Sequence, residues 1–285
     1  MPEGSHAFQV GSICCTVLTD GYDSYPTEWF FANADPRSVQ ATLEGRGMPG
    51  QSVLSPFTCL LIETGRHVIL VDTGAGSASR TSGAICARLE MAGIRPQNID
   101  TVVLTHAHPD HIGGAVGRGG RPVFRNARHV LSEYECEFWT SRRPDLNHLR
   151  VPHELRTAMA PTARTALDAL RFQIETVDRE TEIAPGVRLI PAPGHTPGHL
   201  ALLVTSEGHH LLNLGDAAVH PLHLEQPELE NGFDQASAIA AATRRELLGR
   251  AVSEQMRLMA FHFPFPSVGR VAAREEGGWS WTPGW

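Results

Sequence analysis

The segment 105–114 reads Thr-His-Ala-His-Pro-Asp-His-Ile-Gly-Gly and places four metal-ligand side chains within six positions: His106, His108, Asp110 and His111. A short β-branched run at 99–104 precedes it and predicts a buried strand. The first two histidines are two positions apart, so in an extended backbone they point the same way. The aspartate and the third histidine fall on the following turn, where they can face a second point nearby. Imidazole and carboxylate ligands suit Zn²⁺, with iron or manganese as alternatives, so we expect the chain to fold around a metal site.

Three later residues have the same setting, shortly after a predicted strand: His195, Asp216 and His262. The strands that precede them are predicted at 187–190, 210–214 and 256–261. In α/β proteins, the chemistry gathers outside the carboxyl ends of the strands. We therefore expect these three side chains to meet the cluster at 106–111 in the folded chain.

The rest of the chain alternates strands and helices. Further strands are predicted at 8–18, 58–63, 67–71 and 200–205, and amphipathic helices at 82–92 and 234–255. This order predicts an α/β fold in which two sheets pack face to face with helices outside. We expect one domain over 1–285, with a helical insertion around 142–170.

Composition limits the partners of the chain. Its net charge is −7 and its isoelectric point is near 6.1, whereas binding to nucleic acid needs a basic face. No apolar run approaches the ~20 residues that a membrane-spanning helix needs, and the N-terminus lacks the features of a signal peptide. The five cysteines have no CxxC spacing, and we expect them to be reduced thiols. The sequence therefore predicts a cytoplasmic protein that binds neither nucleic acid nor a membrane.

The complete pattern is His-x-His-x-Asp-His, followed by a further His, an Asp and a final His. It resembles the metallo-β-lactamase superfamily, whose fold is a four-layer αββα sandwich. In that family an aspartate at the position of Asp72, in the sequence Asp72-Thr-Gly74, usually orients a metal ligand. The resemblance implies two divalent metal ions with Asp216 bridging them, one held by His106, His108 and His195 and the other by Asp110, His111 and His262.

The activity that the resemblance implies is hydrolysis. Two metals that share a water lower its pKa, and the bridging hydroxide attacks a carbonyl or phosphoryl centre. Asp110 or Asp216 then carries a proton to the leaving group, which is a catalytic role for either carboxylate. The segments at 194–199 and 261–266 resemble the branch of lactonases and methyl-parathion-hydrolase-like enzymes. The expected substrate is a small, hydrophobic lactone, ester or phosphotriester.

Two departures from family patterns bear on the substrate. True β-lactamases of this fold generally have Cys or Ser where this chain has Asp216, which argues against antibiotic hydrolysis. Acyl-homoserine lactonases often have a Tyr three residues after the bridging Asp, where this chain has Val219. A glyoxalase II-like thioester hydrolase and a mononuclear iron dioxygenase that acts on a thiol are the alternative activities. A homodimer is compatible with this branch.

Aromatic and imidazole side chains near the ligands are candidates for the pocket wall, with packing in the core or on the surface as the alternative. In chain order they are Trp29, Phe30, Phe31, His220, His223, Phe263 and Phe265. An aromatic wall would suit a hydrophobic ester or lactone. His199, in contrast, is expected to serve the fold rather than the metal.

Overall fold

The computed structural model describes residues 4–284, which form two seven-stranded sheets. The strands of the first sheet follow the order of the chain. They are β1 (Ser5–Val10), β2 (Ile13–Pro26), β3 (Ser52–Glu63), β4 (Val68–Val71), β5 (Thr101–Val103), β6 (Arg128–Ser132) and β7 (Ile174–Val177). The strands from β4 to β7 run parallel, so the carboxyl ends of β4 and β5 lie at the same edge.

The second sheet has the order β14-β13-β12-β11-β10-β9-β8. Its strands are β8 (Thr181–Ala184), β9 (Val187–Pro191), β10 (Leu200–Ser206), β11 (His209–Asn213), β12 (Arg257–Met259), β13 (Val268–Ala273) and β14 (Trp279–Pro283). β11 and β12 are parallel, and β9 runs the same way because β9 and β11 are both antiparallel to β10. The carboxyl ends of β9, β11 and β12 therefore share an edge.

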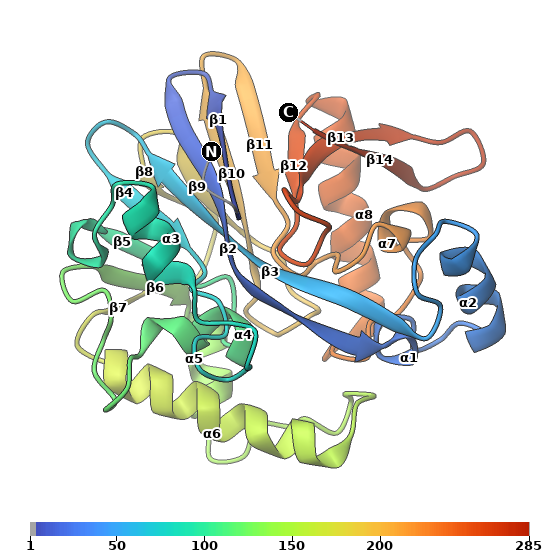
Figure 1. The fold of residues 1–285 in the computed structure, drawn as a ribbon, viewed down its shortest axis with the longest axis horizontal. Coiled ribbons are helices and arrows are strands. Elements are labelled where there is room, and N and C mark those ends of the chain that lie inside the picture. The colour runs from blue at the N-terminus through green and yellow to red at the C-terminus, as the bar shows by residue number, and fades with distance from the viewer. Residues whose placement is uncertain (1–3, 285) are drawn as a thin grey trace.

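Helices lie outside both sheets (Figure 1). They are α1 (Thr27–Phe30), α2 (Pro36–Glu44), α3 (Ile85–Met91), α4 (Pro109–Ile112), α5 (Glu133–Thr140), α6 (His153–Leu170), α7 (Leu222–Glu225) and α8 (Ser237–Ser253), with short 3₁₀ turns η1 (Pro96–Asn98) and η2 (Gly113–Ala115). α3, α5 and α6 cover the first sheet, and α8 covers the second. The helices predicted at 82–92 and 234–255 are confirmed as α3 and α8, with shorter bounds.

Alternating side chains along the strands divide the buried core into layers. In β5, Val103 packs between the two sheets, whereas its neighbour Val102 faces the helices of the outer layer. In β10, Leu202 faces the first sheet, and Leu203 faces the layer that contains α8. Helix, sheet, sheet and helix thus follow one another, and the predicted four-layer αββα sandwich is confirmed.

The prediction of one strand at 8–18 is wrong at the centre of this range. The chain forms a hairpin there, in which β1 and β2 pair from Val10 and Ile13 outward. Gly11 lies in the turn with a φ of +56°, which glycine adopts without steric cost. Apolar residues on both sides of one glycine look continuous in the sequence, so the alternation concealed the turn.

The segment predicted as a helical insertion, 142–170, contributes the helix α6, which contains Pro161. One side of this helix is buried in the layer outside the first sheet, through Met159, Ala163 and Leu167. α6 is therefore part of the outer layer, and its first turns also reach the pocket described below.

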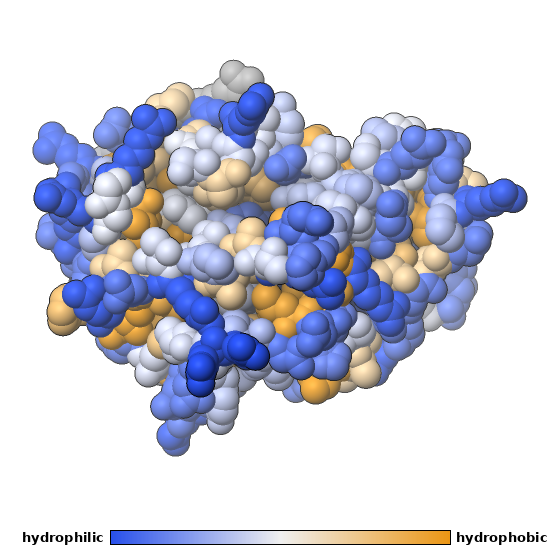
Figure 2. Space-filling model, turned by 90° about the horizontal axis from the view of Figure 1, so that it is seen from below, coloured by the Kyte–Doolittle hydropathy of each residue, from blue (hydrophilic) through white to orange (hydrophobic). Residues whose placement is uncertain are grey.

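The surface of residues 4–284 is mixed. Figure 2 views the molecule from below and shows apolar surface in separate spots between hydrophilic side chains. Large exposed apolar side chains of the described chain include Tyr22, Leu54, Met91, Tyr134, Phe172, Ile239 and Phe265. None of the helices in this range has both the length and the apolar character that crossing a membrane requires.

Candidate metal centre

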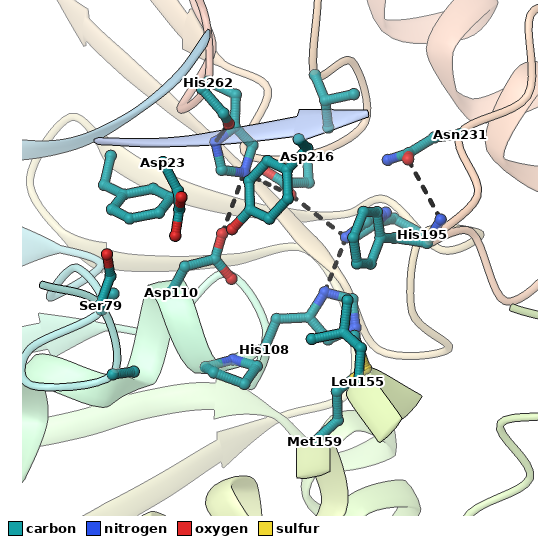
Figure 3. Close-up of a pocket in the computed structure, with 18 of the residues that line it drawn as sticks. Asp23, Ser79, His108, Asp110, Leu155, Met159, His195, Asp216, Asn231 and His262 are labelled. Atoms are coloured by element: carbon teal, nitrogen blue, oxygen red, sulfur yellow. Dashed lines mark hydrogen bonds and ion pairs between the residues drawn. The ribbon is translucent and has the colours of Figure 1, made fainter. Parts of the chain in front are cut away.

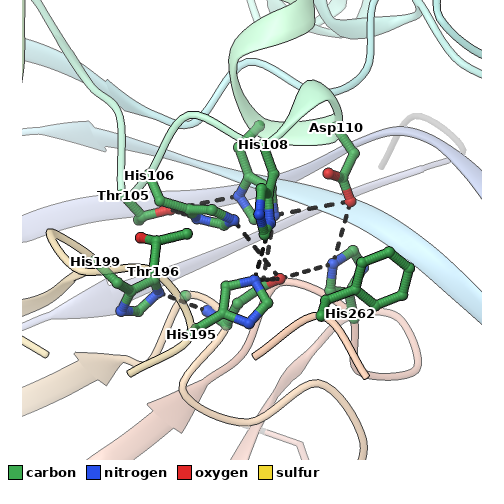
Figure 4. A network of polar contacts seen from close by, with 12 residues as sticks. Thr105, His106, His108, Asp110, His195, Thr196, His199 and His262 are labelled. Carbon is green, nitrogen blue, oxygen red and sulfur yellow. Dashed lines mark hydrogen bonds and ion pairs between the residues drawn. The ribbon is translucent and has the colours of Figure 1, made fainter. Parts of the chain in front are cut away.

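Four loops from the two sheets meet at one place. The loop after β5 carries the cluster at 106–111, and the loops after β9, β11 and β12 carry His195, Asp216 and His262. In Figure 4, labelled histidines from these loops point toward one another. Ligand atoms within 4.8 Å of one another define a first ligand group (His106, His108 and His195), a second ligand group (Asp110, His111 and His262) and a group that links them (His106, His111 and Asp216). The structure thus brings together all seven side chains singled out in the sequence.

Asp216 lies between the two ligand groups. Its Oδ2 is 3.3 Å from Nε2 of His195 and 3.2 Å from Nε2 of His262. Its Oδ1 is 3.4 Å from Nε2 of His111. One carboxylate therefore contacts histidines of both groups, as a ligand shared by two cations must.

Four of the five imidazoles are held from behind through Nδ1. Each Nδ1 contacts a side-chain oxygen: His106 with Thr105 at 3.1 Å, His111 with Asp72 at 2.9 Å, His195 with Asp234 at 2.9 Å and His262 with Ser55 at 2.7 Å. When Nδ1 carries the proton, the lone pair of Nε2 faces the centre. Such partners fix the orientation of metal-binding histidines.

Several buried atoms at the centre have no hydrogen-bond partner among the described residues. They are Nε2 of His106 and His111, and Oδ1 of Asp216, whereas the nitrogen of His108 that faces the centre is Nδ1, at 3.0 Å from Nε2 of His195. Leaving a buried polar atom unpaired costs about 1–3 kcal/mol, so a group of such atoms in one place indicates a bound partner. Nitrogen lone pairs and carboxylate oxygens are the donors that zinc and similar divalent ions take. The residues present fit two divalent metal ions.

The protonation states differ between the two ligand groups. Burial lowers the pKa of His106 and His108 well below the usual range, and neighbouring histidines lower it further. Burial opposes the charge of Asp110, but His111 and His262 bring its pKa down to about 2. Neutral imidazole and ionised carboxylate are the forms that bind metals. Burial lowers the pKa of His111 and His262, but neighbouring carboxylates outweigh it and raise the pKa of His111 well above its usual range and that of His262 to about 9, so a cation at the second ligand group must displace these protons.

Two residues outside the ligand groups hold the loops. The carboxylate of Asp72, at the end of β4, accepts hydrogen bonds from Thr105 N–H at 2.8 Å and from its hydroxyl at 2.9 Å, beside the contact with His111. His199 donates from Nδ1 to a backbone carbonyl and accepts at Nε2 from the N–H of Asp216 at 2.9 Å. Asp72 thus touches a candidate ligand, whereas His199 supports the backbone of another and belongs to neither ligand group.

A pocket of about 450 Å³ opens onto the candidate ligands (Figure 3). Leu155 and Met159 of α6 line the same pocket as the candidate ligands His108 and His195 (Figure 3). Its apolar wall comes from several elements: Tyr25, Phe30, Phe57, Leu155, Ala158, Met159, Val219 and Phe233. A pocket of this size, with polar groups at one place and an apolar wall, suits a small molecule that has an apolar part.

Of the seven side chains considered for the pocket wall, Phe30 lines the pocket. The ring centroid of Phe31 instead lies 5.3 Å from those of His220 and His223, in a buried cluster beside α1 and α2. Both histidines are buried, so neither is a surface residue. Three others are also absent from the lining: Trp29, Phe263 and Phe265. Phe31 therefore packs in the core and does not form part of the pocket wall.

Other residues of the site have no local signal in the sequence. Tyr25 of β2 enters the pocket wall, with its ring 5.9 Å from Phe30 and 6.1 Å from Phe233. Asp234 holds His195 from 39 positions away, and in the sequence it looked like the start of the last long helix. A long-range partner of this kind leaves no local pattern.

Comparison with known proteins connects this geometry to a family. The family model of the metallo-beta-lactamase superfamily matches residues 56–253. An N-acyl homoserine lactonase of Bacillus cereus is 26% identical over 232 residues, which cover 74% of this chain and 81% of the relative. The lactamase-like protein adaB of Aspergillus niger is 43% identical over 219 residues, which cover 74% of this chain and 57% of that protein.

Two solved structures resemble the whole chain. AidC, described as a dizinc quorum-quenching lactonase in complex with a product, superimposes with a TM-score of 0.93 at 26% identity, covering 99% of this chain and 98% of AidC. The hydrolase AbOPH of the beta-lactamase superfamily superimposes with a TM-score of 0.89 at 24% identity, covering 100% of this chain and 99% of AbOPH. The second likeness concerns the fold alone.

Proposed function

The chain belongs to the metallo-β-lactamase superfamily, and on this premise we propose that it is a dinuclear metal-dependent hydrolase that opens lactones. The observation that carries the proposal is the convergence of five imidazoles and two carboxylates, several with unpaired inward atoms, beside an apolar pocket. N-acyl homoserine lactonases among the relatives support lactones as the substrate class.

The first and second ligand groups would each hold one divalent ion, with Asp216 shared between them. We propose zinc, because imidazole and carboxylate are its usual ligands and AidC is described as a dizinc enzyme. When bound, two such ions supply a water of lowered pKa as nucleophile and polarise the carbonyl oxygen of the substrate. The chain itself supplies orientation, through the oxygen partners behind four of the five imidazoles.

The pocket wall supports a lactone that carries an apolar substituent. Leu155 and Met159 of α6 lie on one side, and Phe233 adds a further apolar surface. Val219 lines the pocket at the position where acyl-homoserine lactonases often have Tyr. The neighbouring wall residue Tyr25 offers a hydroxyl from β2 instead.

The ring opening needs a proton at the leaving oxygen. Water adds to the carbonyl carbon, the bond from that carbon to the ring oxygen breaks, and the product is a hydroxy acid. The carboxylate of Asp110 takes the proton released by the water and delivers it to the ring oxygen. Asp110 suits this role better than Asp216, since 21% of its side chain is exposed against 4%.

A substrate panel on metal-quantified protein tests the proposal. The panel contains lactones with short and long apolar chains, an aryl ester, a phosphotriester, a glutathione thioester and a thiol with oxygen consumption recorded. We expect about two metal equivalents per chain, preference for lactones, and loss of turnover on chelation. Asp216→Asn should lower turnover and metal content together. Metal-free protein with activity, or preference for the thioester or the thiol, would contradict the proposal.

A further inference from the structure

Glu135 is a buried carboxylate that none of the motifs includes. It lies in the first turn of α5 and accepts four hydrogen bonds. Oε1 accepts from the N–H of Ala107 at 2.9 Å and from the indole N–H of Trp139 at 2.6 Å. Oε2 accepts from the hydroxyl of Thr196 at 2.6 Å and from the N–H of Gly198 at 3.1 Å. All four partners are donors, so the ionised carboxylate is the form that fits.

Three of these donors come from the two loops that carry the first ligand group, and the fourth, Trp139, lies in α5 itself. Ala107 stands between the first two histidines of the cluster at 106–111, and Thr196 directly follows His195. One carboxylate therefore ties the loop after β5, in the first sheet, to the loop after β9, in the second. Relative movement of the two loops would break hydrogen bonds that are buried away from solvent.

The contact between these parts is close. A Cβ at Gly198 would lie 2.2 Å from the backbone nitrogen of Glu135, so only glycine allows this approach of the loop to α5. Trp139, which shares the carboxylate, packs edge-on against His108 with ring centroids 5.6 Å apart. Each member of the first ligand group thus has a neighbour fixed by Glu135.

The second ligand group is supported by other residues. His111 contacts Asp72 through Nδ1, and His262 contacts Ser55. The four hydrogen bonds of Glu135 reach neither of these pairs. Asp72 and Thr105 support His111 and also His106, so they serve both groups, whereas the hydrogen bonds of Glu135 go only to α5 and to the loops of the first ligand group.

We propose that Glu135 is a positioning residue that sets the metal affinity of the first ligand group and leaves that of the second unchanged. This inference rests on the proposed dinuclear function. Replacing a residue that holds a metal ligand in place typically lowers the metal affinity by about 10- to 100-fold.

The test compares Glu135→Gln with Glu137→Gln, an exposed glutamate of the same helix. The glutamine has nearly the same shape but turns an NH₂ group toward one pair of donors, which breaks one of the two links. Stepwise Zn²⁺ titration against a chromophoric chelator gives the two dissociation constants. In Glu135→Gln one constant should rise by about 10- to 100-fold and the other by less than about threefold. Glu137→Gln should match the wild type.

Cobalt-loaded protein identifies the weakened position. Protons on the free nitrogens of Co²⁺-bound imidazoles give shifted NMR signals. Half-loaded Glu135→Gln should show the signals of the two histidines of the second ligand group. Ser55→Ala, which removes the side-chain partner of His262 in the second ligand group, should give the reverse pattern, with the three histidines of the first group.

Thr196→Val is the milder variant, should Glu135→Gln fold poorly. It removes one donor to Oε2, and a smaller loss at the same position is expected. Equal weakening of both positions, or unchanged constants in both variants, would overturn the role of Glu135. A wild type that binds no second metal would instead overturn the dinuclear function itself, so the two failures are distinguishable.

Discussion

At the scale of single residues, the two central carboxylates differ in their access to the pocket. Asp110 is partly exposed to it, whereas Asp216 is almost enclosed by the histidines. A general acid must reach the leaving group, and removing one costs about 10²- to 10⁴-fold in rate. Asp110→Asn should therefore lower kcat by that factor for an alkyl lactone, whose alkoxide leaving group needs a proton.

An aryl ester provides the internal comparison for Asp110→Asn. Its phenolate leaves without a proton, so its kcat should fall much less in the same variant. The variant also alters a candidate metal ligand, so both rates are measured on samples of equal metal content. An equal loss with both substrates would assign the proton transfer to another group.

His129 of β6 predicts a pH dependence of stability away from the metal centre. Burial lowers its pKa from 6.5 to about 4. The unfolded chain therefore binds a proton at this histidine between pH 6.5 and 4 that the folded chain does not bind. The free energy of unfolding should fall in this range as the pH drops, with a slope of at most about 1.4 kcal/mol per pH unit from this group.

The comparison of His129→Leu with the wild type isolates this effect. Denaturant unfolding at several pH values should show a shallower fall below pH 6.5 in the variant. His153→Gln, at the exposed start of α6, controls for the loss of a histidine as such. A variant with the same slope as the wild type would show that His129 does not titrate in this way.

The seven candidate ligands could be found in the sequence because residues of metal-binding type occur at regular places in it. Four of them fall within six positions, and the others follow apolar runs closely. Glu135 and Asp234 have no such mark, although both fix ligand loops. Their partners lie far away in the chain, and a single acidic residue in a helix or before one looks like any other. Residues that support a site through tertiary contacts are invisible to local pattern.

At the scale of elements, the position of α6 beside the pocket predicts that this helix limits the length of the apolar chain on the lactone. Ala158 lines the pocket on this helix. A tryptophan there would fill space that an apolar chain needs, and pocket changes of this kind alter kcat/KM by roughly 10- to 200-fold. Ala158→Trp should therefore reduce kcat/KM for long-chain lactones and spare short ones.

The matched control is Thr165→Trp, at an exposed position of the same helix. It adds the same side chain away from the pocket, and the selectivity should stay that of the wild type. The measurement is the ratio of kcat/KM for a long-chain and a short-chain lactone. If kcat/KM fell equally for both lactones in Ala158→Trp, α6 would not contact the apolar chain of the substrate.

The elements themselves were predicted well where a strand had a clear apolar run. β9, β10, β11 and β12 appear close to their predicted positions. The hairpin of β1 and β2 was missed because a single glycine made the turn. Strands such as β7 and β14 have only half-buried or exposed residues along much of their length, and their sequences carry little periodicity. A strand can be predicted from the sequence when burial of one or both of its faces leaves an apolar pattern, and β propensity alone is not enough.

At the scale of the whole molecule, the candidate ligands come from loops of both sheets. The fold class followed from the order of elements, but the meeting of the loops did not. It depends on the packing angle of the two sheets and on which strand ends share an edge, and both are properties of the assembled sandwich. The family resemblance supplied that information, because the ligand order implies the topology.

This cross-sheet arrangement predicts that metal stabilises the entire fold. An ion that binds only the folded chain adds about 2.7 kcal/mol at a concentration of 100 times Kd, and each kcal/mol raises Tm by about 2–4 °C in chains approaching this size. Chelation should therefore lower Tm by roughly 5–10 °C, and added Zn²⁺ should restore it. The protein with Asp216→Asn and His262→Ala combined should show a much smaller response to the chelator. Calorimetry with metal content measured on each sample decides the matter: if the metal is fully removed and Tm stays constant, the ions do not link the two sheets.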